Sequence, residues 1–553
     1  MRIVSIGGGP AGLWFSILMK KAFPSTLITV YERNRSDDTF GWGVVFSKET
    51  LGNLAAADPV SYRDIEEQFI YWDDIDNWYR GEKTTSRGHG FCGLSRKTLL
   101  LILQRRAQQL GVTLHFQHEI PSWEQHKDAD LVLAVDGVNS KVRQDLQHVF
   151  EPSLDWRKCK FAWFGTDLPL QAFTFVFEET QWGLFQVHAY PFEKHLSTWI
   201  VECREETWKK AGLDKLSEED SARFCEAIFA KFLKGHRLLC NRSMWRTFPT
   251  IRCRTWRHEN LILMGDAAHT AHFSIGSGTK LAMEDSMGLV EALRAEPNNV
   301  RAALAAYETK RMQEVQRLQR AAQTSLEWFE NSARYLGQGS AQFMFNLMTR
   351  SRRITYDNLN QRDPELVQAT TEAVAGTRPA PPPMFLPFQL RGMTLQNRVV
   401  VSPMCQYSAT DGQVNDWHLV HLGSRAIGGA GLVLTEMTNV SAQGRITPGC
   451  AGIYEDSHTQ AWARIVEFVH KNSPAKIGIQ LAHAGRKGSV GHPWAGEDVP
   501  LTTGAWQTLG PSATPFKPGW PAPRAMTKKD MDQVRELFVA ATLRSKADRK
   551  SVV

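Results

Sequence analysis

The chain has 553 residues, too many for one ordinary domain, and its 42% hydrophobic and 22% charged residues are typical of a soluble globular protein. The net charge of +7 comes without a block of Lys and Arg, and no apolar run reaches the roughly 18 residues of a membrane span, so we expect neither nucleic-acid binding nor a membrane segment. Eight scattered cysteines exclude a paired-cysteine zinc site or a disulfide framework, and the lack of a signal-peptide pattern favours a cytoplasmic location.

A glycine-rich turn follows the first apolar β-type run, at residues 2–6, and precedes an apolar stretch that is typical of a helix. This is the context of a dinucleotide pyrophosphate site: Gly7 permits the tight turn, Gly9 lets the backbone approach the phosphates, and Gly12 lets the helix pack on the strand. Glu32 ends the next apolar run, where such sites hold the ribose hydroxyls. A glycine-rich turn without a ligand is the alternative, which the register of these parts disfavours.

Two further motifs end apolar strand-type runs later in the chain. Asp136-Gly137 follows the run at 130–135, and Gly265-Asp266 follows the run at 261–264. One such motif is weak evidence, whereas three in this order indicate an FAD site.

Between these motifs the pattern changes to short aromatic and β-branched runs, such as 173–177 and 184–190, which predict an antiparallel sheet. Apolar residues at three- and four-residue spacing then predict a long amphipathic helix over 301–335, most simply a packing face.

A proline-rich stretch at 376–384 predicts an interdomain linker. Beyond it we expect strands at 398–402, 431–435 and 476–481, followed by a helix over 528–547. His418 and His421 lack a third ligand at suitable spacing, so we expect a structural role for them and no metal site.

The three nucleotide motifs, together with Arg143, resemble the conserved segments of group A flavoprotein aromatic hydroxylases. The resemblance implies an α/β fold: a para-hydroxybenzoate hydroxylase-like FAD-binding domain with a mixed β substrate domain. It implies the following FAD-binding residues: Gly7, Gly9, Ala11, Gly12, Glu32, Arg33, Arg96, Asp136, Asp266, Gly276 and Gly278.

Residues 40–47 and 269–285 resemble the subfamily that acts on aromatic CoA thioesters. This implies hydroxylation of an ortho-substituted benzoyl-CoA, salicylyl-CoA or anthraniloyl-CoA, at ring position 5 with FAD, NAD(P)H and O2. His269 and His272 are the nearest candidates for a catalytic acid or base, and a structural role for them is equally open. His272-Phe273, Ser277 and Lys280 depart from the usual residues of the wider family.

Two other readings of this part of the chain stay open. One is another FAD enzyme of the same fold, such as a halogenase or an isoprenoid-chain reductase. The other is a flavin-binding remnant or interaction scaffold without turnover.

Residues 395–407 and several later segments resemble the Old Yellow Enzyme family of FMN-dependent ene-reductases. The resemblance implies catalytic roles for Cys405 and Tyr407, and FMN contacts for Pro403, Met404 and Gln480. Residues 385–553 are fewer than the about 250 of a (β/α)8 barrel. We therefore expect a partial, truncated barrel that is inactive and binds no FMN, with a tail at 545–553 unrelated to the family and a homodimer covering the open edges.

The expected domain boundaries combine these observations. They are 1–150 and 256–375 for the two parts of the FAD-binding domain, 151–255 for the β-rich substrate domain, 376–384 for the linker, and 385–553 for the partial barrel.

Overall fold

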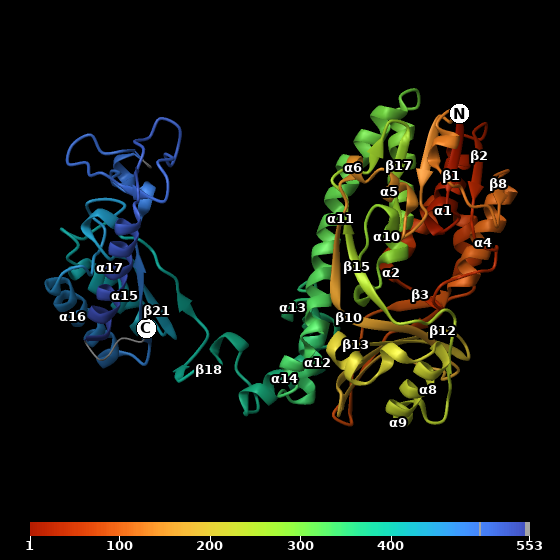
Figure 1. The fold of residues 1–553 in the computed structure, drawn as a ribbon. Coiled ribbons are helices and arrows are strands. Elements are labelled where there is room, and N and C mark those ends of the chain that lie inside the picture. The colour runs from red at the N-terminus through yellow and green to blue at the C-terminus, as the bar shows by residue number, and fades with distance from the viewer. Residues whose placement is uncertain (497–498, 548–553) are drawn as a thin grey trace. The chain divides into compact units, whose positions relative to one another are not determined.

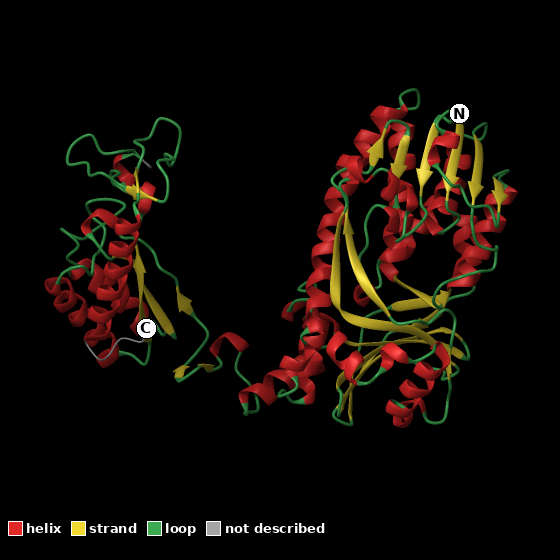
Figure 2. Cartoon of the chain, viewed as in Figure 1, coloured by secondary structure: helices red, strands yellow, loops and turns green. Residues whose placement is uncertain are grey.

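The computed structural model describes residues 1–496 and 499–547, and the chain divides into two compact units, Met1–Ala373 and Val374–Val553 (Figure 1). Each unit mixes helices and strands (Figure 2). In the described part of the chain, no helix combines the length and the apolar character that crossing a membrane requires. The end of the expected unrelated tail, 548–553, lies outside the described residues.

The first unit contains a six-stranded sheet with the order β16-β17-β9-β1-β2-β8. Its strands are β1 (Arg2–Ile6), β2 (Leu27–Tyr31), β8 (Thr113–His115), β9 (Leu131–Ala134), β16 (Arg257–His258) and β17 (Leu261–Leu263). The four adjacent strands β17, β9, β1 and β2 are parallel, and almost every residue of β1, β9 and β17 is buried, as apolar strands in parallel sheets are. Their carboxyl ends therefore meet at one edge of the sheet.

Helices α1 and α10 pack together beside this sheet, and each contacts a further long helix. The helices of this layer are α1 (Pro10–Ala22), α4 (Arg96–Gln109), α10 (Gly278–Ala295) and α11 (Val300–Glu330). Helix α1 begins with Pro10 in its first turn, where a proline costs no hydrogen bond, and ends with Lys20 and Lys21, which suit the negative end of the helix dipole. Helix α11 confirms the prediction of a long helix in this region.

The tight packing of α1 on the sheet requires glycine at two positions. Gly7 has φ +115°, and a Cβ atom there would lie 2.4 Å from the Val135 carbonyl oxygen. A Cβ atom at Gly12 would lie 2.7 Å from the carbonyl oxygen of Gly7. Both contacts are shorter than any real Cβ contact, so a side chain at either position would push α1 off the strands.

A second, eight-stranded sheet has the order β14-β10-β13-β12-β11-β5-β6, with β15 paired to β10. Its strands are β5 (Ile75–Tyr79), β6 (Glu82–Ser86), β10 (Ser153–Thr166), β11 (Phe173–Thr180), β12 (Gly183–Glu193), β13 (Leu196–Arg204), β14 (Leu238–Leu239) and β15 (Arg246–Arg252). Antiparallel pairing of β11 with β12 confirms the sheet predicted from the runs at 173–177 and 184–190.

Side chains alternate between the two faces of this second sheet, as in any strand. Val187, Ala189 and Val201 pack in a core with the helices that follow β13. The intervening residues of β12 and β13 therefore face the other way, toward the first sheet. The helices that follow β13 are α7 (Glu205–Lys210), α8 (Glu218–Ile228) and α9 (Ala230–Leu233).

Smaller elements complete the first unit. A three-stranded sheet, β3-β7-β4, consists of β3 (Gly43–Ser47), β4 (Ile70–Trp72) and β7 (Phe91–Ser95). The remaining helices are α2 (Lys48–Ala57), α3 (Pro59–Glu66), α5 (Lys141–Asp145), α6 (Gln147–Phe150), α12 (Ser340–Thr349), α13 (Tyr356–Arg362) and α14 (Pro364–Ala375).

The second unit alternates strand and helix around three parallel strands, in the order β20-β21-β22. Its elements are β18 (Phe388–Leu390), β19 (Met393–Leu395), β20 (Val400–Val401), α15 (Asp416–Ile427), β21 (Leu432–Asn439), α16 (Asp456–Asn472), β22 (Lys476–Ala482), β23 (Leu509–Gly510), β24 (Arg524–Ala525) and α17 (Lys528–Ala547). The structure confirms the predicted strands at 431–435 and 476–481 and the helix over 528–547. The strand predicted at 398–402 is shorter in the structure, where it is β20. The β18-β19 hairpin was not predicted, because each of its strands has only three residues, too few for an apolar–polar alternation to indicate a strand.

A buried ionic cluster joins α10, α11 and the Gly265-Asp266 motif. The Asp285 carboxylate accepts hydrogen bonds from Gly265 N (3.1 Å) and His269 Nε2 (2.8 Å), and from Nε and Nη2 of Arg311 (3.1 and 2.9 Å). Burial alone would raise the pKa of Asp285, but His269 and Arg311 outweigh it and leave the pKa lowered. The ionised carboxylate therefore fixes the turn of the motif to two helices.

We expect Asp285→Asn to lower the free energy of unfolding of the first unit by about 3 kcal/mol, because Arg311 loses its fully buried counter-charge and is left with the more exposed Glu284 and Glu314. Because the pKa of Asp285 is lowered, the wild type has this stabilisation above the ordinary pKa of about 4 and loses it as the pH falls further, a dependence that the variant lacks. Urea titration followed by near-UV circular dichroism measures both effects.

The matched control is Glu291→Gln, which removes an exposed pair with Lys310 between the same two helices and should cost about 0–1 kcal/mol. Equal unfolding midpoints for the two variants would contradict the stabilising role of the buried cluster.

Candidate flavin and substrate cavity

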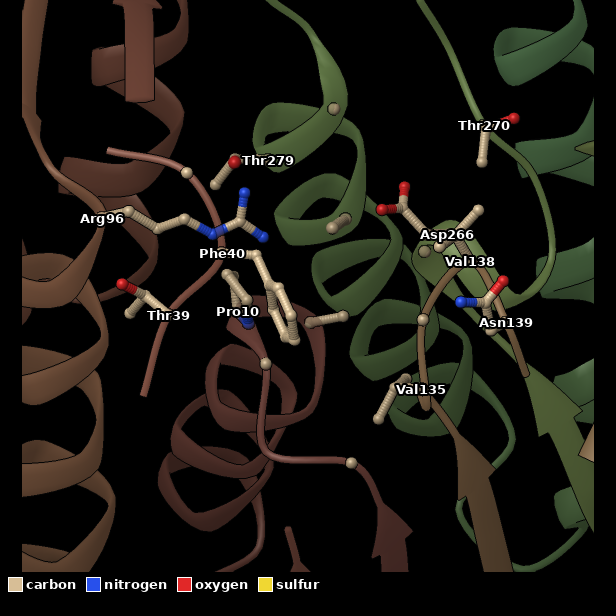
Figure 3. Close-up of a pocket in the computed structure, with 18 of the residues that line it drawn as sticks. Pro10, Thr39, Phe40, Arg96, Val135, Val138, Asn139, Asp266, Thr270 and Thr279 are labelled. Carbon is tan, nitrogen blue, oxygen red and sulfur yellow. The ribbon is translucent and has the colours of Figure 1, made fainter. Parts of the chain in front are cut away.

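A cavity of about 960 Å³ lies in the first unit, lined by residues of both large sheets and of the segments that follow their strands (Figure 3). This volume is at the upper end of the range for small-molecule sites. One end is built from the nucleotide motifs, and the other from aromatic side chains.

The glycine turn after β1 and the residues after β2 form the first wall. Gly9 caps the amino end of α1, and a Cβ atom there would meet no atom of the chain within 4 Å, because it would point into open space. Glu32 Oε2 accepts a hydrogen bond from Gly8 N at 2.8 Å, which fixes the carboxylate beside the turn. A helix amino end with free approach suits a phosphate, and the neighbouring carboxylate suits a ribose.

The Asp136-Gly137 segment after β9 forms the next part of the wall. Asp136 Oδ2 accepts a hydrogen bond from Lys141 N at 2.8 Å, whereas its buried Oδ1 has no hydrogen-bond partner among the described residues. The buried Arg143 donates to the carbonyl oxygens of Val138 (2.6 Å) and Ala267 (2.8 Å). Arg143 thus ties the second motif to the third.

Asp266, three residues beyond the end of β17, extends into the cavity, and Arg96 at the start of α4 extends into the same space from another wall (Figure 3). The Asp266 side chain is exposed to the cavity, and desolvation by the surrounding protein raises the pKa of its carboxyl. Gly276 and Gly278 also line the cavity, where α10 begins. A second helix amino end therefore faces the same space.

The structure brings nearly all of the predicted FAD-binding residues together. The residues that line this one cavity are Gly7, Gly9, Ala11, Glu32, Arg33, Arg96, Asp136, Asp266, Gly276 and Gly278. Gly12 is the exception, since it packs against the strand behind the wall.

Aromatic side chains from the eight-stranded sheet and the loop before α10 form the other end of the cavity. The Phe273 ring centroid lies 5.0 Å from that of Phe161 and 5.8 Å from that of Trp163. The Phe173 and Tyr190 rings stack at 5.5 Å. All five residues line the cavity, so this end offers flat apolar surfaces of the kind that hold an aromatic ring.

Neither of the predicted catalytic histidines lines the cavity. His269 is buried behind the wall and pairs with Asp285. His272 is buried as well: its Nδ1 accepts from Ser274 N at 3.3 Å, and its Nε2 lies 3.9 Å from Glu202 Oε1. Because neither ring lines the cavity, the structure lends no support to a direct acid–base role for these two residues, which stays a prediction.

Sequence reasoning missed a different histidine, which does line the cavity. His188 on β12 faces it, and its Nε2 lies 2.9 Å from Glu202 Oε2 on β13. The signal was present in the chain, because the alternation that places Tyr190 on one face of β12 places His188 on the same face. The pairing of β12 with β13, which brings Glu202 to it, could not be read from spacing.

The predicted residues of the second unit gather at the carboxyl ends of its parallel strands. Pro403, Met404, Cys405 and Tyr407 follow β20, and Gln480 lies near the end of β22 with its side chain exposed. Burial raises the pKa of the Tyr407 hydroxyl to about 12. His418 Nε2 lies 3.2 Å from Glu436 Oε1 in the interior of this unit, which fits the structural role that we expected for this histidine.

A dinucleotide-sized cavity walled by three nucleotide motifs and closed by an aromatic pocket defines a flavin-dependent oxidoreductase. Residues 127–322 match the family described as "FAD binding domain", and residues 383–550 match the "NADH:flavin oxidoreductase / NADH oxidase family".

The chain is 43% identical to a salicyloyl-CoA 5-hydroxylase of Streptomyces sp, over 64% of this chain and 70% of that protein. It is 34% identical to a 3-hydroxy-4-methyl-anthranilyl-[aryl-carrier protein] 5-monooxygenase of Streptosporangium sibiricum, over 60% of this chain and 89% of that protein. The solved structure of 2-methyl-3-hydroxypyridine-5-carboxylic acid oxygenase shares the fold, with a TM-score of 0.51 at 19% identity over 65% of this chain and 97% of that one. The chain belongs to the family of FAD-dependent aromatic monooxygenases, and it carries an NADH:flavin oxidoreductase region at its carboxyl end.

Gly9→Leu tests the nucleotide end of the cavity. The side chain would project into space free of protein atoms, so the variant should fold normally but lose most of its bound FAD, because the side chain would occupy the phosphate position. Flavin absorbance per chain and the thermal unfolding midpoint of the apoprotein measure the two properties.

Gly337→Leu is the matched control, since that glycine is exposed and also has open space around it. A Gly9→Leu protein with full FAD content would show that the phosphates lie elsewhere.

Proposed function

We propose that the first unit hydroxylates the ring of an ortho-substituted benzoyl-CoA, salicylyl-CoA or anthraniloyl-CoA, at position 5, using FAD, NAD(P)H and O2. The observation that carries this proposal is the continuity of one cavity from the nucleotide motifs to the aromatic pocket. The names of both relatives, which describe a salicyloyl or an anthranilyl group on a carrier and the ring position 5, support the same substrate class.

The residues of the cavity fit FAD. The amino end of α1 and Gly9 suit its phosphates, Glu32 suits a ribose, and the unpartnered Asp136 Oδ1 is an acceptor for a further polar group. When bound, FAD supplies the redox chemistry, taking a hydride from NAD(P)H and delivering one oxygen atom of O2 to the ring. Asp266 and Arg96 would then flank the reactive part of the cofactor.

The protein's own contribution is to orient the acyl ring and to exclude water. Trp163, Phe173 and Tyr190 offer flat surfaces for the ring. Position 5 is para to the amino or hydroxyl group at position 2, and that group donates electron density to this carbon. Arg242 and Arg246, which also line the cavity beside Phe40, suit the phosphates of a CoA ester.

The test is to add each CoA ester to the purified protein with NADH or NADPH and to measure oxygen uptake and product. We expect one ester to stimulate NAD(P)H oxidation and to yield the 5-hydroxylated ring. A preparation that only chlorinates, or reduces isolated double bonds, would contradict the proposal. Bound flavin without ester-stimulated oxygen uptake would favour a flavin-binding remnant or scaffold without turnover.

The homodimer and the cytoplasmic location stay predictions.

For the second unit we propose that a polypeptide of this sequence on its own binds no FMN and has no ene-reductase activity. The support is that its described core has three parallel strands, whereas a (β/α)8 barrel closes around eight, and that the Gln480 and Met404 side chains are exposed.

Flavin extraction and chromatography test this second proposal. We expect about one FAD per chain and no FMN, because three strands that do not close into a barrel leave the residues that would contact FMN exposed to solvent. FMN in the extract, or NAD(P)H-dependent reduction of an activated alkene, would contradict it. The Gly9→Leu variant is the control, since it should lose the FAD without any effect on an FMN site.

A further inference from the structure

We propose that His188 is the catalytic base of the hydroxylation, with Glu202 as its positioning residue, and that it accepts the proton of the substrate's ring hydroxyl or amino group. This inference rests on the proposed function and adds the acid–base group that the flavin chemistry leaves unassigned.

His188 lies at the aromatic end of the cavity, and only one of its two ring nitrogens contacts a protein group among the described residues. Its side chain is 1% exposed and lines the cavity, and its Nε2 lies 2.9 Å from Glu202 Oε2. Its buried Nδ1 has no hydrogen-bond partner among the described residues. Of the two ring nitrogens of this cavity-lining residue, Nδ1 is therefore the one that no protein group in the described part of the chain occupies and that is left to accept a proton from a substrate.

The Glu202 carboxylate selects the tautomer of His188. In the tautomer with Nε2 as the donor to Glu202 Oε2, the proton of neutral His188 resides on Nε2, and Nδ1 carries the lone pair. The ring that lines the cavity is therefore a proton acceptor, and a second proton on it would be stabilised by the same carboxylate.

The aromatic surroundings fix the orientation of the His188 ring. Its centroid lies 4.4 Å from that of Phe329, and it makes edge contacts with Phe175 at 5.3 Å and Phe273 at 5.4 Å. The last of these rings also contacts Phe161 and Trp163 in the aromatic pocket, so an aromatic substrate held there would lie next to His188.

Burial keeps His188 neutral at rest, while the charged groups around it act in both directions. Burial lowers the pKa of His188, Glu202 opposes this effect, and Arg350 adds to the lowering. Arg350 lies over the rings of Phe175 and Phe329, on the side of α12. His272 faces the other oxygen of Glu202, and its pKa is also lowered well below the ordinary value by burial and nearby positive charges.

Two further charged groups complete this surrounding. Arg157 on β10 is paired with Glu330 at the end of α11, so it does not compete for Glu202. His188 is thus uncharged near neutral pH and ready to accept a proton.

The O–H or N–H bond of the substituent breaks, its proton moves to His188 Nδ1, and its electron pair forms a double bond to the ring. The ring carbon para to it forms a bond to the oxygen atom that the FAD, NAD(P)H and O2 system delivers as a formal OH⁺. That carbon then loses its own proton to water, the ring becomes aromatic again, and His188 returns its proton to the substituent.

The test compares the wild type with His188→Gln and Glu202→Gln, each as the FAD-loaded full chain. His195→Gln is the matched control, because His195 is exposed in the turn between the same two strands. Single-turnover hydroxylation of the ester that the wild type accepts is measured from pH 5 to 9, together with FAD content, ester affinity and NAD(P)H oxidation.

We expect His188→Gln to keep FAD, ester binding and ester-stimulated NAD(P)H oxidation, but to hydroxylate at least about 100-fold more slowly. The wild type should lose hydroxylation at acid pH as His188 becomes protonated, and His188→Gln should lack this acid limb. Glu202→Gln should slow hydroxylation less and move the acid limb to lower pH, because the negative charge that raises the pKa of His188 is gone.

A His188→Gln protein with the wild-type rate and acid limb would overturn this inference while leaving the proposed function intact. A wild type that makes no hydroxylated product would instead overturn the proposed function, and this inference with it. If His188→Gln fails to retain FAD, the Glu202→Gln variant tests the inference instead. An acid limb of the Glu202→Gln pH profile at the same pH as in the wild type would overturn the inference.

Discussion

The site depends on the parallel order of four strands. Because β17, β9, β1 and β2 lie side by side and point the same way, the residues after each strand meet at one edge of the sheet. Asp266, Asp136, Gly7 and Glu32 are far apart in the chain and adjacent in space for this reason alone. The glycines that allow α1 to pack closely, and the ionic cluster around Asp285, hold the same edge in place.

The nucleotide end of the cavity could be predicted from the sequence because its determinants are local. A strand, a turn residue and a helix start follow one another within a few residues at Gly7 and at Asp136, and Gly265 follows its strand by two residues. The aromatic end depends on contacts between distant segments. The register of β12 against β13 sets Glu202 beside His188, and no spacing in either strand encodes that register.

The two histidines after Asp266 show the limit of motif reasoning. Their proximity in sequence to the Gly265-Asp266 motif suggested a place in the site. In the structure, both side chains instead point into the protein interior, toward the buried partners Asp285 and Glu202. In the second unit, the alternation of strands and helices could equally be predicted, whereas the three-residue strands of the β18-β19 hairpin are too short for their pattern to indicate a strand.

Arg143 has a consequence for the empty protein. By donating to backbone carbonyls of two separate motifs, it satisfies these groups internally and braces the walls against each other. A pocket held open in this way is preorganised: its shape does not rely on the nucleotide to hold the loops apart. Removal of the flavin should therefore leave the cavity intact, and FAD should rebind to the apoprotein without any refolding of the loops.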